Sequence, residues 1–420
     1  MRYKDKISIL GLGYVGLPLA IEFSLKYEVV GYDIDDTRVL ELKNGIDRTN
    51  EVTKEHQLKN KNIKFTCSII DMKGSNYFII TVPTPITKNN KPDLSIIKKA
   101  AETIAKVIDK GAIIVLESTV YPGVTENFLI PIIERNSKLK HKIDFFVGYS
   151  PERINPGETK YKLTNITKVI GADSKSTLIK ISRLYKNIIK AGVHKVSSIK
   201  VAEASKAIEN AQRDINIAFI NEVMMLSKAL KINSYEVLEA AKTKWNFLDF
   251  KPGLVGGHCI GVDPYYLAEA GRKVNFKTNI ILAGRKLNDS IPEYIYDNIR
   301  NKLKRKSRIL ILGLAFKEDV GDIRNSKAVE LAKKIKNGKY VIDCFDPKVS
   351  QKEIKAEYNI IMKNPSGKYD CIIAAVSHKE FINMKINNIL GLLNKNALIV
   401  DIKGIWQKKI PSNHKNYWCL

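Results

Sequence analysis

The pattern that most limits how this chain can fold lies near its start. An apolar strand is expected at residues 6–10, followed by a glycine-rich turn at 11–16 (GLGYVG) and a helix over 17–26. A second strand, residues 28–32, ends at Asp33. Such glycines permit a tight turn and let a pyrophosphate reach the helix N-terminus, while an acid after the second strand binds ribose hydroxyls. The pattern therefore predicts a Rossmann domain that binds a dinucleotide.

The acid also bears on which dinucleotide is bound. Asp33 would repel a 2′-phosphate, which favours NAD over NADP. Arg38 lies close behind it and keeps NADP open at this point, because a nearby cation can accommodate that phosphate. The residues expected to contact the cofactor here are Gly11, Gly13, Tyr14, Val15, Gly16, Asp33 and Arg38.

Three further apolar runs predict more strands of one parallel sheet. They cover residues 77–80, 112–116 and 144–148, and near-continuous apolar strands are typical of a sheet covered on both faces. Ligands of such sheets bind beyond the carboxyl ends of the strands. A polar or proline-containing stretch follows each run, so these stretches are expected to meet the glycine turn in one crevice, unless they are ordinary connecting loops.

The middle of the chain is expected to be helical. Residues 199–230 lack Pro and Gly and carry apolar side chains at spacings of three and four, which predicts one long helix. Lys206, Asn210 and Arg213 share another face, either as its solvated side or as a row of functional groups. A helix of this length also suits a homodimer or interdomain contact. Further helices are expected at 234–242 and 278–304, the latter interrupted around Pro292.

A glycine-rich loop at residues 252–264 contains Cys259 and Asp263. Glycines let the backbone approach a ligand closely, and a cysteine is a nucleophile as its thiolate. The thiol with a carboxylate four residues later is therefore a candidate covalent catalyst. A tight turn with a half-buried thiol would produce the same pattern, so this stretch alone leaves both interpretations open.

The C-terminal part repeats the alternation of strands and helices. Strands are expected at 308–312, 340–345, 371–376 and 397–400. GxGxxG is absent, so a second dinucleotide site is not expected, although Lys317 and Arg324 could contact a nucleotide. The predicted fold is α/β, with two Rossmann-like doubly wound domains joined by a long central helix and an all-α middle domain. The expected boundaries are 1–197, 198–304 and 305–420.

Composition narrows the class of protein. No run of eighteen apolar residues occurs and the chain starts directly with a strand, so we expect a cytoplasmic protein without a membrane partner. Five cysteines lack paired spacing, so neither disulfides nor a metal site is expected. The net charge of +26 suggests a nucleic acid as a partner. The lysines are spread along the chain, however, so a solvated surface is favoured over a binding site for nucleic acid.

Several motifs together resemble the UDP-sugar and GDP-sugar dehydrogenase family over essentially the whole chain. They are GLGYVG at 11–16, EST at 117–119, SPE at 150–152, AEASK at 202–206 with Asn210, GGHC at 256–259 with Asp263, and FK at 316–317 followed by DIR at 322–324. Within the family, RINPG at 153–157, QRD at 212–214 and HCIGVDPYYL at 258–267 look like the UDP-N-acetylhexosamine branch.

The resemblance implies a four-electron oxidation of the sugar C6 alcohol to a carboxylate, with two NAD used in turn. Lys206, Asn210 and Asp263 would hold the water that takes the first proton, and Cys259 would capture the aldehyde and form a thioester. Glu152 would direct the hydrolytic water. The implied catalytic residues are Cys259, Lys206, Asn210, Asp263, Glu152 and Thr119. The implied substrate contacts are Glu152, Arg153, Ile154, Asn155, Lys206, Asn210, Arg213, Gly253, Gly256 and Lys317, and further cofactor contacts are Thr81, Pro83, Thr84, Ser118, Thr119 and Arg324.

Alternatives remain at this stage. Glucose-type members carry a second carboxylate four residues after the position of Glu152, where this chain has Pro156. UDP-N-acetylglucosamine or UDP-N-acetylgalactosamine is favoured as substrate, with UDP-N-acetylmannosamine and UDP-glucose as alternatives. A two-electron hydroxyacid dehydrogenase would have no need for Cys259, and an NAD-sensing or nucleic-acid-binding protein would have no need for the catalytic set.

Overall fold

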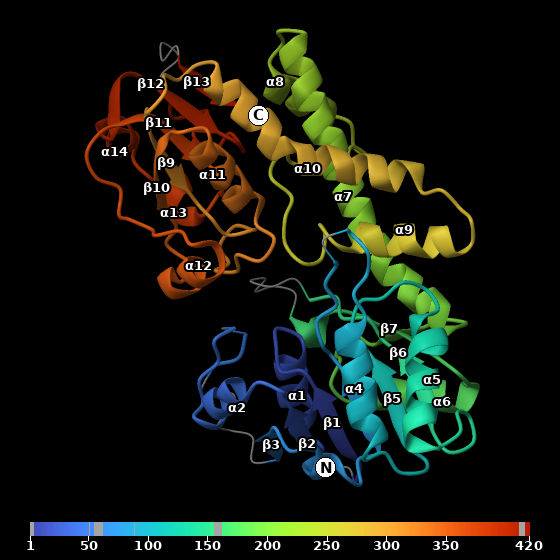
Figure 1. Cartoon of the computed structure of the whole chain (residues 1–420). Coiled ribbons are helices and arrows are strands. Elements are labelled where there is room, and N and C mark those ends of the chain that lie inside the picture. The colour runs from blue at the N-terminus through green and yellow to red at the C-terminus, as the bar shows by residue number, and fades with distance from the viewer. Residues whose placement is uncertain (1–3, 50, 54–61, 88, 155–161, 411–415) are drawn as a thin grey trace. The chain divides into compact units, whose positions relative to one another are not determined.

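The computed structural model describes residues 4–49, 51–53, 62–87, 89–154, 162–410 and 416–420. The chain divides into two compact units: Met1–Glu209 with Tyr265–Lys277, and Asn210–Pro264 with Thr278–Leu420. Each unit contains a sheet flanked by helices (Figure 1). The expected division into three domains stays a prediction.

The first unit is built around an eight-stranded sheet in the order β3-β2-β1-β4-β5-β6-β7-β8. All neighbouring strands are parallel except β6 with β7. The strand order reverses between β1 and β4, and in such sheets the ligand crevice lies beyond the carboxyl ends at this point. The strands are β1 (Lys6–Leu10), β2 (Glu28–Tyr32), β3 (Ile63–Thr66), β4 (Tyr77–Ile80), β5 (Ile113–Leu116), β6 (Phe146–Tyr149), β7 (Lys168–Ala172) and β8 (Val193–Lys195).

Helices cover this sheet because the central strands are apolar on both faces. Every residue of β4 and β5 is buried, and Ile7, Ile9 and Leu17 have no exposed surface. The α-helices of this part are α1 (Gly16–Ser24), α2 (Asp36–Lys43), α4 (Ser95–Ala105), α5 (Ile130–Ser137) and α6 (Lys175–Lys186), with the short turns η1 (Ile69–Met72), η2 (Thr125–Leu129) and η3 (Leu163–Asn165).

The second unit contains a five-stranded parallel sheet in the order β10-β9-β11-β12-β13. The expected fold class, with parallel sheets in the N- and C-terminal parts and a long central helix, is confirmed. The strands are β9 (Arg308–Leu312), β10 (Val341–Phe345), β11 (Tyr369–Ala374), β12 (Leu393–Asp401) and β13 (Tyr417–Cys419). The helices are α8 (Ser234–Lys242), α10 (Asn279–Arg300), α11 (Lys327–Asn337), α12 (Gln351–Tyr358), α13 (Lys379–Ile382) and α14 (Ile386–Gly391).

The long helix α7 (Ile199–Ala229) forms as expected, but the expected apolar face is packed only in part. Ile208, Phe219 and Leu226 are 54%, 57% and 56% exposed. The buried side carries alanines, Ile220, Met224 and polar residues such as Lys206 and Asn210. Alanines let neighbouring elements approach closely, and Glu203, Asn210 and Asn221 make hydrogen bonds there. Spacing alone identified an apolar stripe without telling which side of the helix packs within the chain.

Helix α10 runs through Pro292, so the expected interruption is wrong. Proline inside a helix costs roughly 3 kcal/mol because one hydrogen bond is lost and the ring crowds the preceding turn. Ile291, Ile295 and Ile299 lie around it and are at most 1% exposed. Their burial contributes about 1.5–3 kcal/mol each, which outweighs that cost.

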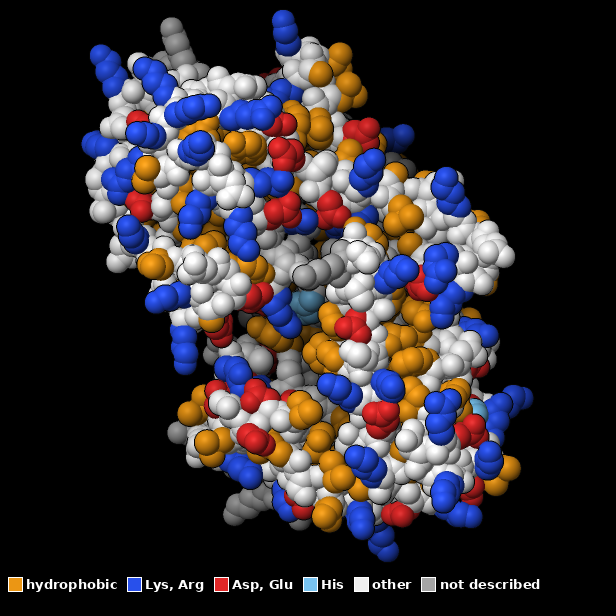
Figure 2. Space-filling view, viewed as in Figure 1, with side chains coloured by type: hydrophobic (Ala, Val, Ile, Leu, Met, Phe, Trp, Pro, Cys, Tyr) orange, Lys and Arg blue, Asp and Glu red, His pale blue; other side chains and the backbone are white. Residues whose placement is uncertain are grey.

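Charged side chains are dispersed over the face of the molecule seen in Figure 2. On the face in Figure 2, Lys and Arg side chains are scattered and interleaved with Asp and Glu. Among the described residues, no helix is long and apolar enough to cross a bilayer. Nor do three or more His, Cys, Asp or Glu side chains in the described ranges gather in a way that could hold a metal ion.

Candidate active site

The glycine turn after β1 is as tight as its sequence predicts. A Cβ on Gly16 would lie 1.8 Å from the Gly11 carbonyl oxygen and 2.5 Å from Thr81 Oγ1. Thr81 Oγ1 donates a hydrogen bond to the Gly11 carbonyl (2.8 Å), which fixes the turn against the end of β4. A Cβ on Gly13, by contrast, would meet nothing within 4 Å. The turn therefore leaves open space beside Gly13 at the start of α1, where a pyrophosphate fits.

Asp33 is half-buried at the end of β2, with its carboxylate at this turn. Its Oδ2 accepts the Leu12 N–H (2.7 Å) and its Oδ1 accepts the Asp35 N–H (3.0 Å). Arg38 is 4% exposed, and its guanidinium bonds Asp47 (2.8 Å) and the Leu12 carbonyl (2.9 Å). The turn and Asp33 thus fit an adenosine ribose and pyrophosphate. Arg38 holds two other partners, and its contact with the cofactor stays a prediction.

The loops after β4, β5 and β6 leave neighbouring strands at the same edge, as expected. Ser118 is buried and donates to the Val82 carbonyl (2.7 Å), which joins the first two loops. Thr119 is half-buried, Thr84 is half-buried and Pro83 is exposed. Glu117 departs from the expected crevice: it is 2% exposed and pairs with Lys168, on β7.

Glu152, in the loop after β6, is 7% exposed. Its Oε1 accepts the N–H groups of Arg153 (2.6 Å) and Ile154 (2.8 Å), and its Oε2 accepts from Lys168 Nζ (2.9 Å). The Arg153 guanidinium turns to Glu209 (2.8 Å) on α7. Ile154 packs against the core of the first unit. The predicted contact Asn155 lies outside the described residues.

The first turns of α7 are anchored by a glutamate for which no role was predicted. Glu203 has no exposed surface and accepts hydrogen bonds from Gly123 N (2.5 Å), Thr125 N (2.9 Å) and Thr125 Oγ1 (2.7 Å). Lys206 follows one turn later and is 9% exposed. Nothing in the sequence near Glu203 distinguishes it from a solvated helix glutamate, because its partners lie about eighty positions away.

Within the second unit, Asn210 and Asp263 meet as the resemblance implies. Asn210 Nδ2 donates to Asp263 Oδ2 at 2.5 Å, and both side chains are buried. Asp263 begins α9 (Asp263–Lys273), and the Cys259 carbonyl accepts its N–H (2.9 Å). Cys259 is partly exposed just before this helix. Arg213, also on α7, is exposed.

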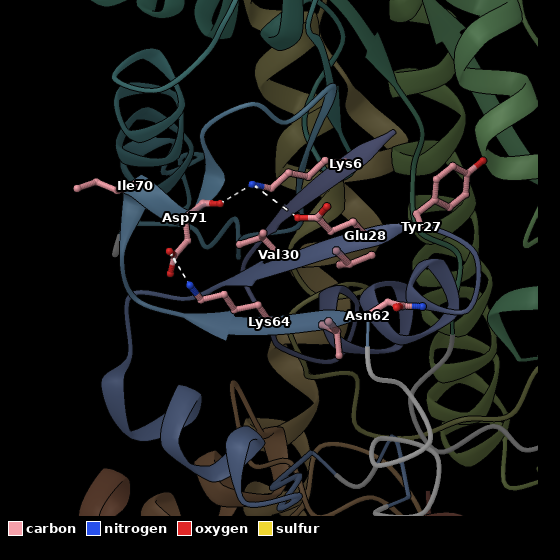
Figure 3. Close-up of a pocket in the computed structure, with 10 residues that line it drawn as sticks. Lys6, Tyr27, Glu28, Val30, Asn62, Lys64, Ile70 and Asp71 are labelled. Carbon is pink, nitrogen blue, oxygen red and sulfur yellow. Dashed lines mark hydrogen bonds and ion pairs between the residues drawn. The ribbon is translucent and has the colours of Figure 1, made fainter. Parts of the chain in front are cut away.

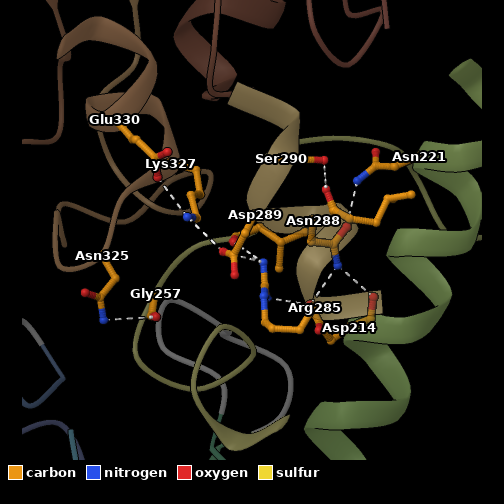
Figure 4. Close-up of polar contacts among 12 residues, drawn as sticks. Asp214, Asn221, Gly257, Arg285, Asn288, Asp289, Ser290, Asn325, Lys327 and Glu330 are labelled. Carbon is orange, nitrogen blue, oxygen red and sulfur yellow. Dashed lines mark hydrogen bonds and ion pairs between the residues drawn. The ribbon is translucent and has the colours of Figure 1, made fainter. Parts of the chain in front are cut away.

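The loop that carries Cys259 is held on one side by a buried polar network (Figure 4). Asn221 accepts the Gly253 N–H (2.8 Å) and donates to the Gly253 carbonyl (3.1 Å). Arg285, 1% exposed, bonds the Val255 carbonyl (3.3 Å) and Asp214 (2.6 Å). Burial raises the pKa of Asp214 to about 6, although Arg285 opposes the rise. The loop backbone is thus fixed by side chains from α7 and α10.

On its other side the loop touches the segment that follows β9. A Cβ on Gly256 would lie 2.4 Å from the Asn325 carbonyl oxygen, and one on Gly257 would lie 2.6 Å from the Phe316 ring. Only glycine permits this approach. Lys317 is half-buried in the same segment, and Arg324 bonds Asp322 (2.5 Å) and contacts His258 (3.4 Å).

The C-terminal sheet has an acid in the position that corresponds to Asp33. Asp346 follows β10 and is 4% exposed. It accepts the N–H groups of Leu314, Ala315, Lys348 and Val349 and contacts the His378 ring (3.0 Å). Because His378 Nδ1 accepts the Asp319 N–H, its Nε2 carries the proton and donates to Asp346. The carboxylate of Asp346 is therefore occupied by hydrogen bonds within the protein.

A cavity of about 650 Å³ lies away from these groups, at the amino ends of β1, β2 and β3 (Figure 3). Its charged lining residues pair with one another: Lys64 with Asp71 at 2.7 Å and Lys6 with Glu28 at 3.9 Å. The glycine turn occupies the opposite edge of the same sheet, so this cavity is separate from the cofactor site.

Comparison with known proteins agrees with this geometry. Three models of the UDP-glucose/GDP-mannose dehydrogenase family match: the NAD binding domain at residues 5–189, the central domain at 200–290 and the UDP binding domain at 310–408. The chain is 47% identical to UDP-N-acetyl-D-glucosamine 6-dehydrogenase of Salmonella typhi, over 95% of this chain and 96% of that protein. It is 46% identical to protein CapL of Staphylococcus aureus, over 99% of both chains.

Among solved structures, the UDP-D-ManNAc dehydrogenase from Pyrococcus horikoshii superposes with a TM-score of 0.86 at 31% identity, covering 99% of this chain and 98% of that one. The matched domains span most of the sequence, and the glycine turn, Asp33 and the Cys259 loop lie within them. The chain therefore belongs to the UDP-glucose/GDP-mannose dehydrogenase family and is an NAD-dependent nucleotide-sugar dehydrogenase.

Proposed function

We propose that this enzyme oxidises the C6 alcohol of a UDP-N-acetylhexosamine to the uronic acid, with UDP-N-acetylglucosamine as the favoured substrate. The observation that carries the proposal is the 47% identity, over 95% of this chain, with a relative named UDP-N-acetyl-D-glucosamine 6-dehydrogenase. NAD accepts a hydride in each of the two oxidations. The product would serve as a precursor of a surface polysaccharide.

In the first oxidation, the C6 hydroxyl loses its proton to a water held by Lys206, Asn210 and Asp263. The burial of all three side chains and the Asn210–Asp263 hydrogen bond support this role. A buried ammonium and amide also suit the second task proposed for Lys206 and Asn210, which is to stabilise the oxyanion formed later at the same carbon.

In the second oxidation, the sulfur of Cys259 forms a bond to the aldehyde carbon, and the thiol proton passes to the carbonyl oxygen. Loss of a hydride and a proton from this thiohemiacetal leaves a thioester. Glu152 then directs a water to the thioester carbon, the C–S bond breaks, and the carboxylate leaves while the sulfur regains a proton. The partial exposure of Cys259 supports its role as the nucleophile.

The remaining assignments concern binding. Thr119 would align the reacting groups, and Lys317 would hold the diphosphate. The other proposed substrate contacts are Arg153, Ile154, Asn155, Arg213, Gly253 and Gly256, and the proposed cofactor contacts are those of the glycine turn with Asp33, Arg38, Thr81, Pro83, Thr84, Ser118 and Arg324.

NADH formation on a panel of UDP-sugars tests the proposal. We expect the highest kcat/KM on UDP-N-acetylglucosamine and two NADH per sugar, with UDP-N-acetylgalactosamine, UDP-N-acetylmannosamine and UDP-glucose as comparisons. Equal activity on UDP-glucose would overturn the acetylhexosamine assignment. A yield of one NADH per sugar would overturn the four-electron reaction.

We further propose a cytoplasmic homodimer. On α7, the side chains of Ile208, Phe219 and Leu226 are each more than half exposed in the single chain, and a second copy would cover them. NAD and free UDP-sugars are reactants of the cytoplasm. Sedimentation equilibrium should give twice the chain mass of 47.4 kDa, and a monomer at micromolar concentration would contradict the dimer.

A further inference from the structure

A buried cluster of charged residues lies directly beside Glu152, and the reaction as described does not use it. Lys168 Nζ is 2.5 Å from Glu117 Oε2 and 2.9 Å from Glu152 Oε2. The hydroxyl of Tyr185 donates to the other oxygen of Glu117. Glu117 follows β5, Glu152 follows β6, Lys168 begins β7 and Tyr185 lies on α6, so four elements of the first unit meet at one ammonium.

Such a cluster is expensive to build. Glu117, Lys168 and Glu152 are 2%, 3% and 7% exposed, and charges taken out of water lose several kcal/mol of hydration each. Apolar residues of similar volume would often be at least as stable there. Stability alone therefore explains this cluster poorly. Its contact with Glu152 points to a use at that carboxylate.

The electrostatics keep the lysine charged. Burial alone would lower the pKa of Lys168, but the negative charges of Glu117 and Glu152 outweigh it and hold the pKa above its ordinary value. Burial raises the pKa of Glu117, with Lys168 opposing the rise. Burial and the neighbouring Glu117 also raise the pKa of Tyr185 well above its usual range, so its hydroxyl remains a neutral donor.

Glu152 is consequently surrounded by donors. Two backbone N–H groups point at Oε1 and the Lys168 ammonium points at Oε2. The charged side chains of Arg153, on the same loop, and Glu209, on α7, pair with each other at 2.8 Å. Among the described residues, the contacts of Glu152 are all donors, and they hold its carboxylate in one orientation.

We propose that Lys168, supported by Glu117, is a positioning residue that holds the Glu152 carboxylate oriented toward the water that hydrolyses the thioester. This inference rests on the role proposed above for Glu152. In that step the water oxygen bonds to the thioester carbon, one water proton is handed through Glu152 to solvent, and the C–S bond breaks. No electrons are transferred, and the proton needs a carboxylate that is ionised when the water attacks.

The test compares pH profiles of carboxylate formation in Lys168→Met, Lys168→Arg and Glu117→Gln. Lys168→Met removes the cation that contacts the Glu152 carboxylate, so we expect the acidic limb of the profile to move to higher pH and turnover to fall about 10- to 100-fold. Lys168→Arg should restore much of the loss. Glu117→Gln removes the competing anion, so the acidic limb should move to lower pH. Lys228→Met is the matched control, because that half-buried ammonium contacts Trp418 and the Cys419 carbonyl instead.

Opposite shifts distinguish positioning from general damage to the fold, and the near-isosteric Glu117→Gln keeps the test valid if Lys168→Met does not fold. Unmoved profiles, or shifts in the same direction, would overturn the inference. The variant Glu152→Gln distinguishes a failure of the role proposed for Glu152 from a failure of the positioning role proposed for Lys168. If that variant still hydrolyses the thioester at the normal rate, the role of Glu152 itself is wrong. If it fails to do so while the Lys168 and Glu117 variants match the parent, only the positioning role is wrong.

Discussion

Cys259→Ser is expected to lower uronic acid formation by about 10³-fold or more while NAD binding is kept. The serine hydroxyl is far less acidic than a thiol and has no base assigned to it, so the aldehyde is not captured and the second oxidation has no covalent substrate. The first oxidation does not use sulfur. A single turnover with excess enzyme should therefore yield aldehyde and at most one NADH per sugar, measured by absorbance and product analysis.

Cys419→Ser is the matched control, since Cys419 is also partly exposed and has no proposed role in the reaction. Its turnover should equal that of the parent. Two NADH per sugar from the Cys259 variant at the parent's rate would show that oxidation to the acid needs no thioester. A labelled UDP-sugar quenched on the parent enzyme should also give a mass adduct that disappears in Cys259→Ser.

Arg285→Met is expected to lower the free energy of unfolding by about 3–5 kcal/mol, because it leaves a buried carboxylate without its cation. Asp214 has no exposed surface and lies 2.6 Å from the Arg285 guanidinium. The Val255 carbonyl loses a donor at the same time. The loss can be measured by urea unfolding, and the double variant Asp214→Asn with Arg285→Met should recover a large part of it.

The loss should also depend on pH. Burial raises the folded-state pKa of Asp214 to about 6, and removing Arg285 raises it further. The folded chain then holds a proton that the unfolded chain has released, so stability falls as pH rises through this window. The deficit of Arg285→Met should be larger at pH 8 than at pH 5. Arg300→Met on the same helix removes an exposed pair with Asp297 and a long cation–π contact with Tyr296, and it should change stability by about 0.5 kcal/mol or less.

The features that could be predicted well from the sequence are those that depend on residues adjacent in the chain. The expected bounds of β1, β2, β4 and β9 match the structure, because each is an apolar run closed by glycine, threonine or an acid. The turn at Gly11 and the acid Asp33 could be placed because their geometry follows from neighbouring residues. The roles of Asn210 and Asp263 are implied by the resemblance and stay predictions, and the structure places those two side chains in contact.

What the sequence missed depends on partners far along the chain. Strand β7 begins with the charged Lys168, which hides a buried strand from a hydrophobicity pattern, and its partner Glu117 lies 51 positions away. Glu117 was expected in the ligand crevice because its pairing with the distant Lys168 could not be inferred from the sequence. Asn221 and Arg285 look like solvated helix residues until the Gly253 and Val255 backbone is placed against them. Polar residues at these sites are specified by tertiary contacts, for which periodicity carries no signal.

The two Rossmann-like sheets differ at one carboxylate, and that difference bears on competition between ligands. Asp33 keeps part of its surface free, whereas Asp346 is enclosed by four backbone N–H groups and the protonated nitrogen of His378. An adenosine ribose would have to displace those donors to bind the C-terminal sheet. Binding of NAD to the C-terminal sheet is therefore disfavoured, and this sheet lies in the region that the UDP binding domain model matches.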